Sequence, residues 1–146
     1  MIIFALREPN ATSVEKNGLG YVVAYVGELG GTVPYTAYNA RRSYIENNRD
    51  VIEKFTRAVD KGLKYVYEHD NEEIAKIMLD YFPDTSLSDM ITIVKRYKSN
   101  EAWKKNITIN EDEWLHIQEI MKSAGELDEY VLYDKLIYTE YFKDYE

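Results

Sequence analysis

The sequence predicts a helix-rich α/β fold with about three strands and four to six helices. Three observations lead to this prediction. Apolar runs rich in β-branched and aromatic residues are confined to the first 42 residues, where they indicate strands. The longest amphipathic pattern follows directly within Val33–Glu68, and a strand that leads into a long helix is typical of an α/β unit. Beyond it, further amphipathic segments begin at capping residues, which is typical of helices.

The predicted strands all lie in the first part of the chain, before the long amphipathic pattern. They are Ile2–Leu6, Tyr21–Val26 and Pro34–Arg42. Between the first two strands, Pro9 suits the first turn of a short helix over Asn10–Asn17, and Gly18 ends it. Gly27–Thr32 reads as a loop, and Ser43–Asn48 as a turn.

Four longer helices are predicted after this turn from apolar stripes at helical spacing. They span Arg49–His69, Asp70–Phe82, Ser86–Tyr97 and Asn110–Ala124. The last three begin with a capping residue followed three positions later by an acid, as in Asp70 with Glu73. The tail Glu126–Glu146 carries apolar side chains that we expect to anchor it along the surface. They are Leu132, Leu136, Ile137 and Phe142.

Composition narrows the functional classes. Hydrophobic residues form 45% of the 146-residue chain, which is enough to fill the core of a single domain. The formal net charge is −8, and the basic residues are interleaved with acids, so neither nucleic acid nor an anionic membrane surface is an expected partner. No apolar run reaches the roughly 18–20 residues of a transmembrane helix, and we find no export signal in the chain.

No pattern in the sequence predicts an enzyme, a metal site or a cofactor. The chain has no cysteine, which excludes thiolate metal sites and cysteine nucleophiles. Its two histidines, His69 and His116, lack metal-ligand spacing, and we expect both to lie on the surface or half-buried. The acidic clusters open helices, where carboxylates favour the positive end of the helix dipole. An enzyme is therefore the weakest interpretation, and no catalytic residue is predicted.

Two places carry candidate ligand-binding residues. Tyr35 and Tyr38 flank Thr36 on a predicted strand, where their rings either stack on a flat ligand or pack on the sheet. Arg7 and Glu8 follow a predicted strand and precede a helix, which is where ligands bind in α/β proteins. The alternative for this second pair is a salt-bridged turn.

Three stretches of the chain share the order and spacing of a known family. They read ALREPNATSVEKNGLGYVVAYVG, VPYTAYNARRSYIENNRDVIEKFTRAVDKGLKYV and ITINEDEWLHIQEIMKSAGELDEYVLYDKLIYTEYF. Together they resemble bacterial substrate-binding proteins of ABC importers for nitrate, sulfonates, taurine and thiamine pyrimidine precursors. The family usually has Pro where this chain has Arg49, and often an aromatic residue in place of Arg7.

This resemblance implies the C-terminal half of a two-lobe protein of the type II periplasmic-binding-protein class. Residues 1–146 would form one partial lobe: a crossover strand over 1–8, strands and a short helix over 9–42, a helical part over 43–125 and a tail over 126–146. A small ligand would lie in an interlobe cleft. The matching cleft positions are Arg7, Glu8, Tyr35 and Thr36, to which we add Tyr38.

The full-length family also implies an ABC transporter permease as partner and an extracytoplasmic location, either periplasmic or membrane-anchored. The alternative from another class is a small helical interaction protein. A truncated lobe would expose apolar surface, through which the chain would form a homo-oligomer.

Overall fold

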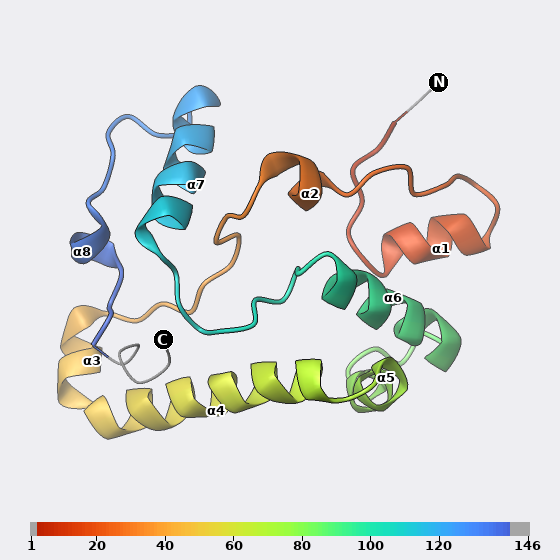
Figure 1. Cartoon of the computed structure of the whole chain (residues 1–146), viewed down its shortest axis with the longest axis horizontal. Helices are drawn as coiled ribbons and strands as arrows, with labels where there is room; N and C mark the ends of the chain where they lie inside the picture. Colours follow the sequence, from red (N-terminus) through yellow and green to blue (C-terminus); the bar gives the residue numbers. More distant parts are fainter. Residues whose placement is uncertain (1–2, 141–146) are drawn as a thin grey trace. The chain divides into compact units, whose positions relative to one another are not determined.

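The computed structural model describes residues 3–140, and over this range it contains helices joined by extended or irregular segments (Figure 1). Eight helices are present in the described range. They are α1 (Asn10–Lys16), α2 (Val26–Gly30), α3 (Arg42–Asn47), α4 (Arg49–Glu68), α5 (Asn71–Leu79), α6 (Leu87–Ser99), α7 (Glu111–Ser123) and α8 (Tyr133–Leu136).

The predicted α/β class is wrong, because residues 3–140 form no strand. The three segments predicted as strands are non-helical over most of their length but pair with no neighbour in the described chain. Their apolar side chains are exposed, with Phe4 at 76% and Val23 at 80%. A high β-propensity marks a residue that fits a half-buried sheet surface, but it cannot supply the partner strand whose backbone must donate and accept the hydrogen bonds. Ile2, the first residue of the first predicted strand, lies outside the described residues.

Two segments predicted as loop or turn are short helices, which raises the number above the predicted four to six. The predicted loop Gly27–Thr32 lies mostly within α2, and the predicted turn Ser43–Asn48 lies mostly within α3. After α2, Gly31 has a φ of +77°, and a Cβ added there would lie 3.1 Å from Nε2 of His116. A glycine therefore suits both the backbone conformation and the space at this position.

The four longer helices are confirmed, and their caps are those that the sequence predicts. The Asp70 side chain accepts a hydrogen bond from Glu73 N at 2.8 Å, and the Ser86 hydroxyl accepts one from Asp89 N at 3.2 Å. Asn110 and Glu113 form a reciprocal capping box at the start of α7. These caps satisfy backbone N–H groups that the first turn of a helix leaves unpaired, so each of the three helices begins where its capping residue lies.

The chain divides into two compact units. Unit 1 comprises Met1–Leu29 and Lys64–Lys105, and unit 2 comprises Gly30–Leu63 and Asn106–Glu146.

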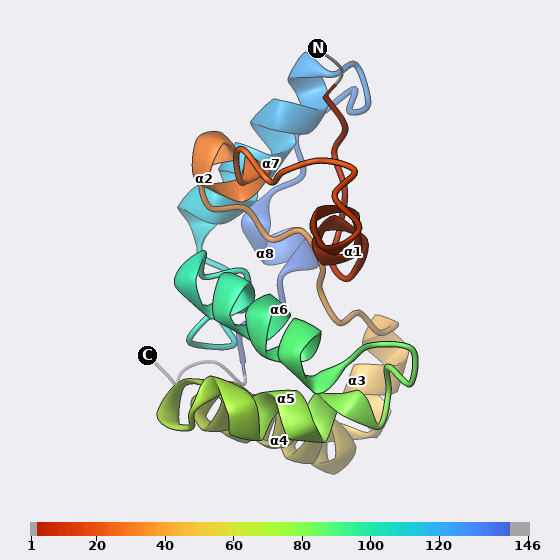
Figure 2. The ribbon, with the colours of Figure 1, turned by 90° about the vertical axis from the view of Figure 1, so that its right-hand side faces the viewer.

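Unit 1 contains the buried hydrophobic core of the described residues, formed by α5 and α6. Its buried members are Ile74, Ala75, Met90, Ile93 and Val94. Trp103, which follows α6, packs against this core and meets the Tyr97 ring edge-on, with ring centroids 5.1 Å apart. Helix α6 also contacts α1 (Figure 2). Unit 1 is therefore a small helical cluster centred on α6.

Unit 2 is held together largely by polar contacts between α7 and the segment that follows it. Gln118 is buried, its Oε1 accepts from Val131 N at 2.6 Å, and its Nε2 donates to Val131 O at 3.2 Å. Trp114 Nε1 donates to the same carbonyl oxygen at 2.8 Å. The chain after α7 thus returns along this helix, bound by a side-chain amide that takes the place of a neighbouring strand.

The predicted apolar anchors of the tail do not perform this function. Leu132 and Leu136 are exposed, Ile137 is partly buried, and Phe142 lies outside the described residues. The hydrogen bonds of Gln118 anchor the segment instead, and a single buried Gln on a helix gives no sequence pattern from which that could be read.

Candidate functional site

The five residues predicted to bind a ligand belong to different units. Arg7 and Glu8 belong to unit 1, whereas Tyr35, Thr36 and Tyr38 belong to unit 2. Each group is therefore described within its own unit.

The tyrosines of unit 2 present their rings to solvent. Tyr35 is 79% exposed, and Tyr38 is exposed to a similar extent. The Tyr38 ring meets Phe55 of α4 edge-on, with ring centroids 4.8 Å apart, an arrangement that fixes an aromatic ring. Because the described residues contain no sheet, packing on a sheet does not explain these tyrosines, and stacking on a ligand stays a prediction.

Glu8 of unit 1 is part of a network of hydrogen bonds centred on Arg96. The Arg96 guanidinium donates to Glu8 Oε1 at 2.9 Å and to Thr12 Oγ1 at 3.0 Å, and it also donates to Glu15. The second oxygen of Glu8 accepts from Thr12 N at 3.0 Å, and the Glu8 side chain is only 8% exposed. Both carboxylate oxygens are thus bound within the protein, as the salt-bridged-turn alternative expects, while the neighbouring Arg7 is exposed.

Two carboxylates where α1 meets α6 have lowered pKa values. The Val22 N–H, which donates to Glu15 at 2.9 Å, is the main cause of the lowered pKa of Glu15, and the Arg96 hydrogen bond adds to it. Lys16, whose Nζ lies 2.6 Å from Oδ2 of Asp89, is the main cause of the lowered pKa of that carboxyl group, followed by Ser86. In both cases the hydrogen bonds stabilise the ionised form.

Acid is therefore expected to destabilise unit 1 through these two groups. A carboxyl group with a lowered folded-state pKa adds stability above its unfolded-state pKa, and this stability is lost as the pH falls through the folded-state value. We expect Asp89→Asn to melt at a lower temperature than the wild type at pH 6, with the difference closing at about pH 3. Circular dichroism melts at both pH values measure it.

Asp112→Asn, in unit 2, is the matched control for this experiment. A difference between Asp89→Asn and the wild type that is equally large at both pH values would show that the contribution of Asp89 does not depend on its charge.

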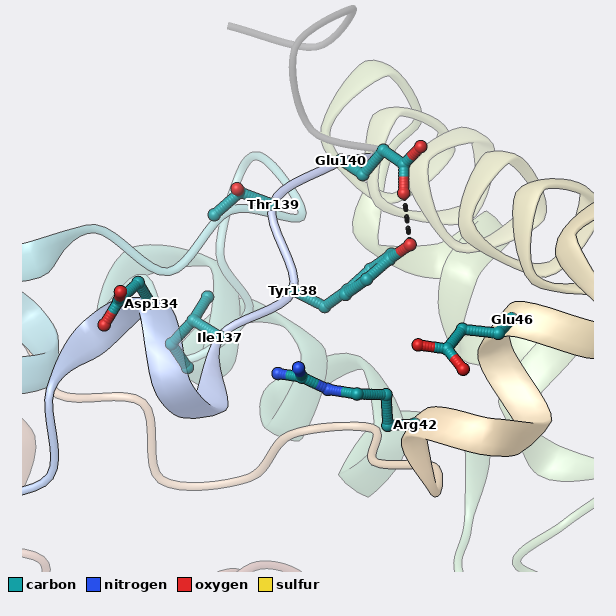
Figure 3. A pocket seen from close by; sticks show the side chains of 7 residues that line it. All are labelled: Arg42, Glu46, Asp134, Ile137, Tyr138, Thr139 and Glu140. Atoms are coloured by element: carbon teal, nitrogen blue, oxygen red, sulfur yellow. Dashed lines mark hydrogen bonds between the residues drawn. The ribbon is translucent and has the colours of Figure 1, made fainter.

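A pocket of about 320 Å³ lies within unit 2, and the sequence did not predict it. Its lining residues come from α3, from α8 and from the segment after α8 (Figure 3). They are Arg42, Glu46, Asp134, Ile137, Tyr138, Thr139 and Glu140. Arg42 and Glu46 face the segment that carries Tyr138, and the Tyr138 hydroxyl donates to Glu140. Arg49 donates to the other carboxylate oxygen of Glu140 at 3.0 Å.

The sequence missed this pocket because α3 was predicted as a turn. Only a helix places Arg42 and Glu46, four residues apart, on one face. Their apposition with Tyr138 joins segments about a hundred residues apart in the chain, a contact that no local pattern encodes.

Two further kinds of site were sought in the described range. Residues 3–140 hold no group of three or more His, Cys, Asp or Glu side chains that could bind a metal ion. Within the same range, none of the helices has the length and apolarity required to cross a membrane.

Comparisons with known proteins place the chain among binding proteins, in agreement with the resemblance identified from the sequence. Residues 2–73 match the family model described as "NMT1/THI5 like". Over 135 residues, 92% of this chain, the sequence is 38% identical to "Putative binding protein YtlA" of Bacillus subtilis (strain 168). The chain spans 40% of the length of that relative. The comparison with solved structures gives no significant match.

Proposed function

We propose that this chain, which belongs to the NMT1/THI5-like family, forms part of a solute-binding protein that delivers a small molecule to an ABC importer. The observation that carries this proposal is the identity to a protein named as a binding protein, which extends over 92% of the chain. The chain performs no bond chemistry in this function. Its part is to supply one wall of a cleft that closes over the ligand by a hinge motion.

The ligand-contacting wall in this proposal contains Tyr35, Thr36 and Tyr38, with Arg7 as a cationic group. Two exposed aromatic rings with a hydroxyl between them suit a flat, polar heterocycle, because the rings can stack on its faces while the hydroxyl binds its polar edge. A thiamine pyrimidine precursor has this chemistry. A sulfonate would depend on Arg7 instead, because an anion needs a positive partner.

The exposed apolar residues also fit a binding protein built from more than one wall. Leu19, Tyr21 and Val23 are largely exposed within one short segment of unit 1. Apolar surface of this extent commonly marks contact with another polypeptide, and the permease or a further part of the same protein is the occupant in this function.

Ligand titration of the chain tests the proposal. We expect an aminopyrimidine precursor of thiamine to shift the ring resonances of Tyr35 and Tyr38 saturably in NMR spectra. Affinity is expected to be weak, because binding a small ligand tightly requires burying most of its surface. Stacking on one aromatic side chain contributes about 1–3 kcal/mol, so Tyr35→Ala or Tyr38→Ala should weaken binding roughly tenfold.

Tyr81→Ala is the matched control, since Tyr81 of unit 1 is also largely exposed and is not one of the predicted site residues. Taurine and nitrate serve as the sulfonate and inorganic-anion probes, for which Arg7→Ala is the informative variant. If no probe gives a saturable shift, or if Tyr81→Ala weakens binding as much as Tyr35→Ala does, the proposed wall is wrong.

A further inference from the structure

We infer that the pocket between α3 and residues 134–140 of unit 2 is a second binding site, for a small zwitterion that carries an ammonium and a carboxylate group. None of its lining residues belongs to the wall proposed above, so this site is independent of the Tyr35 and Tyr38 surface. The argument rests on the charges in the pocket, on the way its opposite wall is held, and on its size.

Arg42 and Glu46 are the first element of the argument, because they line the pocket without pairing with each other. In the described part of the chain, neither side chain has a hydrogen bond or an ion pair. Other helical pairs at the same spacing do form ion pairs. They are Asp50 with Lys54, Glu53 with Arg57, Glu72 with Lys76, and Glu101 with Lys105.

The order of the charges explains this difference. In all four ion pairs the acid precedes the base, which is the favourable orientation on a helix. Arg42 precedes Glu46, which is the weaker orientation. Both side chains instead face the segment of Ile137 and Tyr138 (Figure 3), so a cation and an anion are available side by side on one wall.

The opposite wall is fixed by its own hydrogen bonds. The Tyr138 hydroxyl donates to Glu140, and Arg49 donates to the same carboxylate at 3.0 Å. The Tyr138 ring is therefore oriented before a ligand arrives, which reduces the entropy lost on binding. Beside it, partly buried Ile137 offers an apolar contact for a short aliphatic chain.

The charges of the pocket select the ligand class. Asp134, which also lacks a hydrogen bond or ion pair in the described chain, adds a second carboxylate to that of Glu46. A simple anion is disfavoured, because it would meet two unpaired carboxylates and only one guanidinium. A zwitterion satisfies both signs: its carboxylate binds Arg42, and its ammonium group binds Glu46 or Asp134.

The volume limits the ligand to the size of an amino acid. The pocket measures about 320 Å³, near the lower end of the roughly 300–1,000 Å³ usual for small-molecule sites. We therefore use glycine, 4-aminobutyrate and 6-aminohexanoate as zwitterions of increasing length. Butyrate and butylamine are the matched probes that carry one charge each.

Titration of the full chain, followed by the NMR resonances of Ile137 and Tyr138 and by calorimetry, tests the inference. We expect at least one zwitterion to bind saturably and roughly tenfold more tightly than butyrate or butylamine, because each single-charge probe loses one charge-assisted contact. Absence of saturable binding by all three zwitterions, or binding of a single-charge probe as tightly as the best zwitterion, would overturn the inference.

Charge reversal provides the decisive variants. Arg42→Glu and Glu46→Arg should each weaken zwitterion binding roughly tenfold or more, whereas the double variant should recover it with the ligand reversed. The double variant also places the acid before the base, so a variant with intact circular dichroism but no recovery counts against the site. Lys54→Glu makes the same charge change as Arg42→Glu elsewhere in unit 2 and should leave affinity unchanged.

The two proposals fail separately. Tyr35→Ala should not affect zwitterion binding, and Arg42→Glu should not affect the shifts that an aminopyrimidine causes at Tyr35. A zwitterion that loses affinity in Tyr35→Ala but not in Arg42→Glu would assign its binding to the other surface and overturn this inference.

Discussion

Replacing Met90 with Ala is expected to lower the free energy of unfolding of unit 1 by about 2–5 kcal/mol, the range found when large core side chains are truncated. Met90 is 1% exposed and lies in the core that α5 and α6 form with each other. Truncation to Ala removes the contacts of three side-chain atoms and leaves a cavity that rigid neighbours such as Val94 fill only in part.

Denaturant unfolding followed by NMR measures this loss for each unit, since the Trp103 indole reports unit 1 and the Trp114 indole reports unit 2. Met121→Ala is the control, because Met121 is exposed on α7. A surface substitution of this kind costs about 0.5 kcal/mol or less. Equal losses in the two variants would show that the α5–α6 core does not dominate the stability of unit 1.

The longer helices could be predicted because their signals are local. Asp70 and Asn110 bind backbone N–H groups only three residues away, and an apolar stripe is visible within one helix. The boundaries of α4 to α7 therefore follow from residues close to them in the sequence. Gly18 and Gly125, which adopt positive φ angles after α1 and α7, mark helix ends for the same reason.

The strands could not be predicted correctly because a strand depends on a distant partner. The run Tyr21–Val26 has the composition of a buried strand, yet Val23 is 80% exposed and the run pairs with no strand in the described chain. The glycines of α2 and the asparagines at the end of α3 favour loops over short helices. In both kinds of segment the local preference was read correctly, and the surroundings decided the structure.

The candidate site shows the same limit. Tyr35 and Tyr38 were selected as unusual aromatic residues, and their exposure agrees with a surface that binds something. The partner of Glu8 could not have been identified from the sequence, because Arg96 lies 88 residues away. The pocket between Arg42 and Tyr138 was missed because it too depends on a contact between distant parts of the chain.

The second large effect is expected at Arg96, where Arg96→Met keeps the aliphatic stem but removes the group that binds Glu8, Thr12 and Glu15. Removing one partner of a buried ion pair costs about 3–5 kcal/mol, since the remaining charge has no compensation. The Arg96 side chain is 27% exposed, so water replaces part of the interaction, and we expect a loss of about 2 kcal/mol from unit 1.

A double-mutant cycle separates the charge from the packing. Glu8→Gln removes the buried charge but can still accept from Thr12 N, so it should cost less in the Arg96→Met background than in the wild type. Arg57→Met is the control, because Arg57 pairs only with the exposed Glu53 on α4 in the described chain, and such surface pairs contribute about 0–1 kcal/mol. If Glu8→Gln costs the same in both backgrounds, Arg96 stabilises unit 1 through its stem, and the ion pair that joins α6 to the turn before α1 contributes little.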